Sequence, residues 1–156
     1  VNTYRALGND ITLTTTANKY SGVSTSYTPR YSDSFIEVSY HFPLNYFQST
    51  SNSFWSWEIG LVFDADDELD IALGTSLTGG TLYQQSKLRG GSDYSYIASI
   101  GTNLFKTFII PPADHTTATI KMHSYAKAIS NVATDKMFLG NNEGTLMDFI
   151  NIKEWR

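Results

Sequence analysis

Carboxylates form the densest group of side chains that could do chemistry, in the acidic run over residues 64–70. Hard cations such as Ca²⁺ take several oxygen ligands that converge at about 2.3–2.6 Å. The helix-loop-helix calcium pattern fails here, because Leu69 stands where its glycine is needed and Thr75 where its bidentate glutamate is needed. The run therefore favours a solvated, self-repelling loop between strands. Its calcium candidates are Asp64, Asp66, Asp67 and Asp70.

The other reactive side chains do not form a catalytic or metal-binding pattern. His41 and His123 fall on the polar faces of predicted strands and His115 falls in a loop, with no spacing typical of zinc ligands. The chain has no Cys and no Gly-x-Ser-x-Gly elbow. Glu37 and Glu58 would have to face each other across a groove to serve a polysaccharide-degrading enzyme, and the ordinary interpretation is that they keep strand faces soluble. We expect that the protein is not an enzyme and that it holds neither a cofactor nor a metal ion.

Composition favours an all-β protein that does not bind nucleic acid. Aromatic residues make up 14% of the 156-residue chain and charged residues only 17%, a balance common in β-sandwiches. The formal charge of −4 and the absence of any Lys/Arg run argue against a nucleic-acid partner. No stretch of about 18 apolar residues predicts a membrane span. The length fits one domain over residues 1–156.

The elements that must position these side chains are strands. Apolar and polar residues alternate most clearly over residues 34–42, 55–63 and 116–126. Shorter strands are expected over residues 11–16, 20–27, 69–73 and 81–86. Residues 1–19 are expected to supply an N-terminal strand or an extension that links to a neighbour. Paired glycines and prolines mark turns between the strands, so the sequence predicts an antiparallel β-sandwich with little or no helix.

Two segments are apolar on both faces. Over residues 104–110 and 146–155, large apolar side chains point in both directions of a strand. A sandwich core covers only one face of a strand, so the other needs a loop, a short helix or another subunit. We interpret the pattern as a hint of self-association. The interface candidates are Phe105, Ile109, Met147, Phe149 and Trp155.

Aromatic residues also gather in two segments that look like connections. Tyr46, Phe47, Tyr94 and Tyr96 carry rings suited to contact with sugars or proteins. They are the candidates for receptor contact. The alternative is that these rings fold back and cap the open ends of the sandwich.

Residues 20–38 resemble a motif that recurs in bacteriophage virion proteins. In that motif a Ser/Thr-rich strand ends in Tyr-Thr-Pro-Lys/Arg, here Tyr27, Thr28, Pro29 and Arg30, followed by a Ser-rich turn and an apolar strand. The later segments 57–60, 113–122 and 147–155 are similar to the strands that follow. The resemblance covers most of the chain from Tyr20 onward. The departures are the acidic run and the Tyr/Gly-rich stretch over residues 82–96.

Such domains are similar to the trimeric C1q/TNF-like jelly rolls of tail fibres and virion surfaces. The resemblance implies a jelly roll, a homotrimer in contact with other virion proteins, and a virion location after synthesis in the host cytoplasm. It carries over no catalytic residue. The first expectation is a tail-fibre domain that binds a host surface glycan or protein. The alternative is a structural capsid decoration or tail adaptor protein without receptor binding.

Overall fold

The structure is a computed structural model of the 156-residue chain. The backbone is described for residues 2–5, 10–12, 14, 16–48, 55–90, 102–128, 136–139 and 148–156. Side chains are described for residues 14, 16–41, 58, 60–82, 105–127 and 149–156. Within these ranges the chain is almost entirely β-strand, with one 3-10 turn at Pro112–Asp114, which confirms the all-β prediction.

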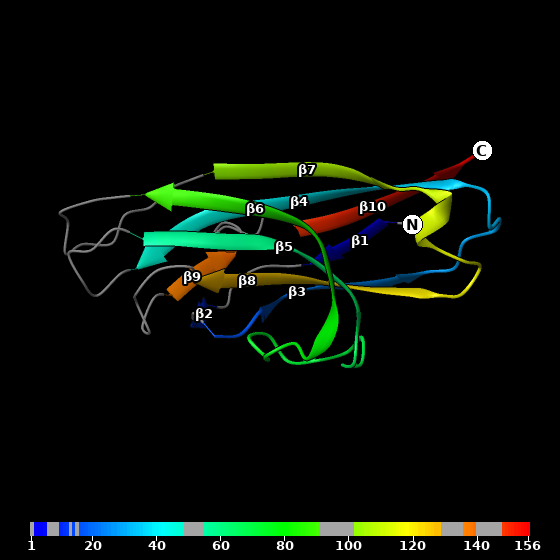
Figure 1. The fold of residues 1–156 in the computed structure, drawn as a ribbon. Helices are drawn as coiled ribbons and strands as arrows, with labels where there is room; N and C mark the ends of the chain where they lie inside the picture. Colours follow the sequence, from blue (N-terminus) through cyan, green and yellow to red (C-terminus); the bar gives the residue numbers. More distant parts are fainter. Residues whose placement is uncertain are drawn as a thin grey trace.

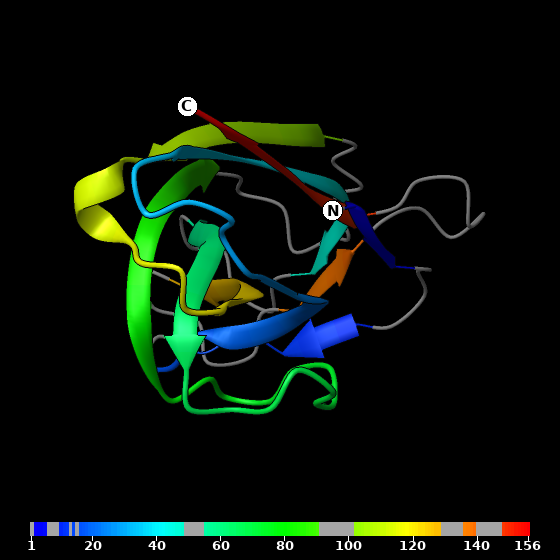
Figure 2. The ribbon, with the colours of Figure 1, turned by 90° about the vertical axis from the view of Figure 1, so that its right-hand side faces the viewer.

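Two antiparallel sheets pack against each other (Figure 1). The first, called the β4 sheet, contains β1 (Asn2–Arg5), β10 (Asp148–Trp155), β4 (Phe35–Gln48), β9 (Lys136–Leu139), β2 (Asp10–Thr12) and β7 (Thr102–Ile110), which pairs with β4. The second, called the β5 sheet, contains β3 (Lys19–Tyr27), β8 (Ile120–Ala128), β5 (Trp55–Ala65) and β6 (Gly79–Gly90). Figure 2 shows the two layers from the end, with β4, β7 and β10 above β3, β5 and β8. The predicted antiparallel β-sandwich is therefore confirmed.

The strand pairing is nested. Apart from the short β2 and β9, the first strand pairs with the last, β1 with β10, and β3 pairs with β8. Inside these pairs, β4 pairs with β7 and β5 with β6. The described strands of residues 1–19 thus pair within the chain itself, β1 with β10 and β2 with β9.

The main core lies between the sheets and follows the alternation of the sequence. Ile36, Val38 and Tyr40 of β4 are buried while Glu37 between them is only half-buried. The same period places Ile120, Met122 and Ala126 of β8 in the core. The core contains Val23, Ile36, Val38, Tyr40, Leu61, Phe63, Phe108, Ile110, Ile120, Met122, Ala126, Ile150 and Ile152. The alternation predicted for residues 34–42 is confirmed where side chains are described.

A second, smaller core lies on the far side of the β5 sheet, and the sequence did not predict it. Residues 66–78 connect β5 to β6 and fold back over this face, where the backbone of Thr75 and Leu77 bonds to the start of β3. Figure 2 shows this connection on the side of the β5 sheet away from β4. The second core contains Tyr20, Val62, Ala65, Leu77 and Tyr125, with Ile71 packed against them.

The second core corrects three predictions. His123 was expected on a polar strand face and is fully buried at 0% exposure, and Glu58, expected to keep a face soluble, is 8% exposed. Both belong to the face that residues 66–78 cover. The strand expected over residues 69–73 does not form, because these residues belong to the covering connection. The acidic run continues from the end of β5 into this connection, and Asp64, Asp66, Glu68 and Asp70 are exposed, which agrees with the predicted solvated loop between strands.

The prolines and paired glycines at residues 79–80 and 111–112 lie at strand ends, but the glycines belong to a strand rather than to a turn. Pro111 separates β7 from the 3-10 turn, which begins at Pro112, and β8 begins at Ile120 rather than at residue 116. Gly79 and Gly80 open β6 with φ of 65° and 74° instead of forming an isolated turn. A Cβ on Gly80 would come within 2.6 Å of the backbone oxygen of Phe63, so the close approach of β6 to β5 requires glycine.

Candidate functional site

Exposed apolar side chains gather on one face of the molecule, the side of the β4 sheet that points away from the core. We call this the outer face. Among the described residues, four of the six exposed large hydrophobic side chains lie on it: Phe105 at 59% exposure, Ile109 at 48%, Phe35 at 40% and Trp155 at 38%. The other two, Tyr31 and Leu82, lie elsewhere. The outer face is formed by odd-numbered residues of β4, β7 and β10.

Strand register brings the predicted interface residues together on this face. Phe149, His41 and Phe105 occupy neighbouring positions on β10, β4 and β7. The rings of Phe149 and Phe105 meet edge to face at 6.3 Å between centroids, and His41 stacks on Phe149 at 5.1 Å. Ile109 lies two positions from Thr107 on the same side of β7. Met147 lies outside the described residues.

A second apolar group ends the outer face near the C-terminus. Trp155 pairs in register with Phe35, and the two rings stack with 6.1 Å between centroids and 18° between planes. Between the two groups lie polar side chains, including Ser39 and Thr107, whose hydroxyls are 3.0 Å apart. The outer face therefore has two apolar groups separated by a polar row, a mix that suits a protein–protein interface.

A different arrangement occurs at the end of the sandwich, around the carboxylate of Glu154. Its oxygens accept hydrogen bonds from the hydroxyls of Tyr27 at 2.6 Å and Ser34 at 2.5 Å. They also accept hydrogen bonds from the backbone N–H groups of Arg30 and Tyr31, with N···O distances of 3.0 and 3.1 Å. Consecutive backbone N–H groups that converge on an anion form a nest. The segment between β3 and β4 is thus folded around a carboxylate from β10.

The hydrogen bonds change the titration of both partners. Burial disfavours the charged form of Glu154, but the bonds from Ser34, Tyr27 and the two backbone N–H groups outweigh it and lower the pKa to about 2. Burial, together with the hydrogen bond to the Glu154 carboxylate, raises the pKa of Tyr27 to about 12. At neutral pH the pair therefore consists of a carboxylate and a neutral phenol.

The sequence analysis missed Glu154, although β10 carries a signal for it. Ile150 and Ile152 point into the core, and by alternation the next inward position is Glu154. A carboxylate at an inward position must find donors or remain unpaired. The Tyr-Thr-Pro-Arg motif supplies two of these donors, the Tyr27 hydroxyl and the Arg30 backbone N–H, so it has a structural role here.

A surface ion pair fixes the chain end beside this cluster. Arg156 donates two hydrogen bonds to Asp33, at 2.9 and 2.8 Å, and its guanidinium lies 4.3 Å from the centroid of the Tyr31 ring. The hydrogen bond from Arg156 lowers the pKa of Asp33, although burial acts in the opposite direction. The Tyr31 ring is thereby held in place at the surface.

The acidic run does not form a metal site in the structure. Asp64 accepts the backbone N–H of Lys121 at 3.1 Å, and Asp67 accepts that of Thr78 at 2.8 Å, so these two carboxylates bond to the protein. Within the described ranges, no three His, Cys, Asp or Glu side chains group closely enough to hold a metal ion. The other two calcium candidates, Asp66 and Asp70, are exposed.

Glu37 and Glu58 do not face each other. Glu37 lies on the outer face of the β4 sheet. Glu58 is buried on the β5 sheet and accepts a hydrogen bond from the Tyr125 hydroxyl at 2.7 Å. Burial and the bond to Glu58 raise the pKa of Tyr125. The sandwich thus separates the two carboxylates, and the geometry needed for glycoside hydrolysis is not assembled by this pair.

The three histidines occupy unrelated places. His41 lies on the outer face, and Nδ1 of His123 is 2.7 Å from the Ser24 hydroxyl under the cover. Burial lowers the pKa of His123, which favours its neutral form. His115 follows the 3-10 turn, with Nε2 2.8 Å from the backbone oxygen of Ser34. The structure does not bring them together.

The receptor-contact candidates are only partly described. Tyr46 and Phe47 were expected in a connection, but they belong to β4, opposite Phe138 and Met137 of β9. Tyr94 and Tyr96 lie outside the described residues. The strand extends past residue 42 because its last part pairs with β9, a long-range contact that the local pattern does not show.

The chain matches no protein-family model and no curated protein. Among the residues that the structure describes, none of the helical structure has the length and apolar character to cross a membrane. The function must therefore be argued from the surfaces described above.

Proposed function

We propose that the chain is a jelly-roll domain that assembles into a homotrimer through its outer face and is displayed on the outside of a bacteriophage particle. There it attaches the particle to a host surface glycan or protein. The observation that carries this proposal is the uncovered outer face, with Phe105 and Ile109 about half exposed. The far face of the β5 sheet, in contrast, is covered by the chain itself.

The nested strand pairing supports the jelly roll. A jelly roll contains eight strands in two sheets with Greek-key connections. Here eight strands pair from the outside inward, β1 with β10, β3 with β8, β4 with β7 and β5 with β6. The resulting orders are β1-β10-β4-β7 in one sheet and β3-β8-β5-β6 in the other.

The outer face supports self-association. Large exposed apolar patches on a soluble domain mark interaction sites, and phenylalanine and tryptophan are enriched at protein interfaces. Another copy of the chain would cover Phe105, Ile109 and Trp155, as the connection 66–78 covers Val62 on the other sheet. The number of three copies, the virion location and the attachment role follow from the resemblance of residues 20–38 and of the later strands.

Light scattering of the purified chain tests the assembly. We expect a mass of three chains for the unaltered protein and of one chain for Phe149→Asp and for Ile109→Asp, because a charge would enter a buried seam at a cost of several kcal/mol. Leu82→Asp is the matched control, since Leu82 is similarly exposed at 37% but lies on β6, and it should keep the mass of three chains. A single-chain mass for the unaltered protein contradicts the proposal, and a two-chain mass contradicts the trimer.

Competition with the virus tests the attachment role. A receptor-binding protein should bind the bacteria that the parent phage infects and slow adsorption of the phage. The alternative, a capsid decoration or tail adaptor protein, should bind empty shells or tails and leave adsorption unchanged. Adsorption that is unchanged at saturating protein therefore contradicts the attachment role in favour of the structural one.

A further inference from the structure

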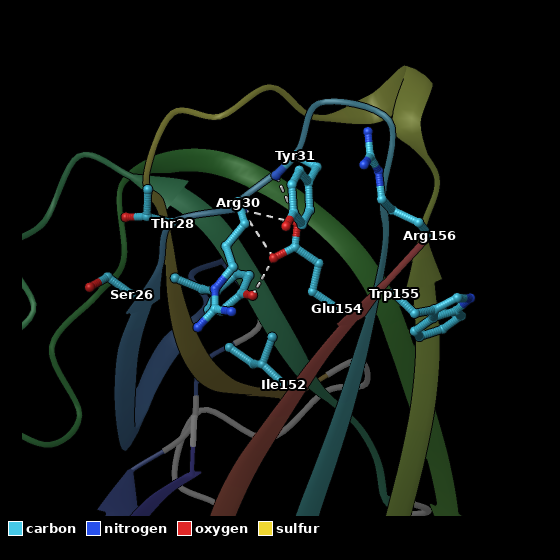
Figure 3. Close-up of a pocket in the computed structure, with 9 residues that line it drawn as sticks. Ser26, Thr28, Arg30, Tyr31, Ile152, Glu154, Trp155 and Arg156 are labelled. Carbon is cyan, nitrogen blue, oxygen red and sulfur yellow. Dashed lines mark hydrogen bonds between the residues drawn. The ribbon is translucent and has the colours of Figure 1, made fainter.

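A cavity of about 610 Å³ opens at the end of the sandwich, between the ends of β3 and β10 (Figure 3). Its volume falls in the usual range of small-molecule sites. Its wall combines hydroxyls, two arginines, a carboxylate and aromatic rings. The lining residues that matter for recognition are Ser26, Thr28, Arg30, Tyr31, Glu154 and Arg156.

The one carboxylate of this wall already has its hydrogen-bond donors. The Glu154 carboxylate receives the Tyr27 and Ser34 hydroxyls and two backbone N–H groups. It therefore has little capacity left for a ligand that brings donors. The charge of Glu154 is satisfied from within the protein, and it serves to hold the segment between β3 and β4.

The donors are not all occupied. The guanidinium of Arg156 is committed to Asp33 by two hydrogen bonds. Among the described residues, no carboxylate lies within ion-pair distance of the Arg30 guanidinium, and the Arg30 side chain is exposed. Figure 3 shows this side chain extending along the cavity toward Ser26 and Ile152. The cavity thus presents an uncommitted fork of N–H donors, and a matching ligand must supply acceptors.

We propose that this cavity binds an acidic saccharide, with the carboxylate of the sugar held by the Arg30 guanidinium. Arginine pairs with carboxylates through two parallel hydrogen bonds. The proposal deepens the attachment function, on which the identity of the ligand as a host surface glycan rests. It assigns recognition to the end of the sandwich, while the outer face serves self-association.

The rest of the wall favours a sugar over a peptide. Ser26 and Thr28 border the cavity with hydroxyls that can bond to a sugar ring. The Tyr31 ring, 46% exposed and held by Arg156, offers a fixed aromatic surface. The lining has one aliphatic side chain, Ile152, which is itself 5% exposed. The rest of the apolar lining consists of the aromatic rings of Tyr27, Tyr31 and Trp155, whose faces suit contact with a sugar ring.

Calorimetric titration of the full chain with a galacturonic acid trisaccharide tests the proposal. We expect binding to the unaltered protein, and binding at least about tenfold weaker for Arg30→Gln, since the charge-assisted bonds are lost. Arg30→Gln keeps the backbone N–H that bonds to Glu154, so the fold should persist, and a circular dichroism melt checks this. Lys106→Gln is the control, because it removes one positive charge from β7, away from the cavity, and should bind like the unaltered protein.

Two further ligands sharpen the result. The neutral galactose trisaccharide should not bind, and sodium acetate at matched carboxylate concentration should bind far more weakly than the acidic trisaccharide. The proposal is overturned if the acidic trisaccharide does not bind, if Arg30→Gln binds it equally well, or if either comparison ligand binds as tightly. If the acidic trisaccharide binds while the unaltered protein has the mass of a single chain or leaves phage adsorption unchanged, the site stands and the proposed function fails. If the protein is a trimer that slows adsorption but does not bind the trisaccharide, only the site proposal fails.

Discussion

The outward faces of the two sheets differ: the chain covers one of them, and the other carries exposed apolar side chains. On the β5 sheet, residues 66–78 fold back and bury Val62 and Tyr125 to 1% and 0% exposure. On the β4 sheet, Phe105 and Ile109 remain 59% and 48% exposed. Both faces carry large apolar side chains, so apolar character alone does not distinguish a second core from an interaction surface. What distinguishes them is whether the chain supplies its own cover.

The largest effect is expected from a charge placed under the cover. Val62→Asp should lower the free energy of unfolding by about 3–5 kcal/mol, because it buries an unpaired carboxylate. Its register partner Leu82 is 37% exposed, and Leu82→Asp should cost less than about 1 kcal/mol. Urea denaturation measures both. Equal effects would mean that residues 66–78 do not seal the second core.

A smaller loss of stability is expected from a substitution at the end of the sandwich. There, Glu154 on the β4 sheet bonds to the segment that follows β3 of the β5 sheet. Glu154→Gln should cost about 1.5–3 kcal/mol, since hydrogen bonds to a charged acceptor are weakened. Glu68→Gln, at an exposed carboxylate of the covering connection, is the control and should have little effect. The comparison separates a carboxylate that joins the two layers from one that faces solvent.

The contribution of Glu154 should depend on pH in a defined direction. Its pKa is lowered from 4.5 to about 2 on folding, so its stabilisation is complete above about pH 4.5 and is lost as the pH falls toward 2. The difference in stability between the unaltered protein and Glu154→Gln should therefore shrink over that window. Denaturation at pH 6, 4 and 2.5 measures it, and a difference that stays constant contradicts the assigned hydrogen bonds.

The smallest effect is expected inside the second core. Tyr125→Phe removes the hydroxyl that donates to Glu58 and leaves a buried carboxylate oxygen without that donor. The expected cost is about 1–2 kcal/mol. Tyr31→Phe alters an exposed hydroxyl and serves as the control. A neutral outcome for Tyr125→Phe would show that water reaches Glu58 under the cover, which would weaken the contrast between the two faces.

Much of the fold was predictable because strand alternation is a local signal. The inward positions of Ile36, Val38 and Met122 follow from a period of two along their own strands. Phe105 and Ile109 were predicted to point to one side of their strand, and Phe108 and Ile110 to the other. The exposure of the first two and the burial of the last two confirm this prediction. These assignments need no knowledge of which strands pair.

The errors arose where a distant segment changed the surroundings of a strand. His123 and Glu58 occupy strand positions that would face solvent in a bare sheet, but both are buried on the face where the connection 66–78 packs. Tyr46 and Phe47 belong to a strand because β9, about ninety residues later in the sequence, pairs with them. The role of Glu154 likewise depends on donors from a turn that precedes it by more than a hundred residues.

The sequence by itself determined that this chain forms strands, which side of most strands faces inward, and that some strands are apolar on both sides. Only the tertiary structure decided which of those second sides the chain covers for itself and which it leaves open. The physical reason is that the local period depends on adjacent residues alone. Burial of an outward face and partners for an inward carboxylate depend on which distant segments meet.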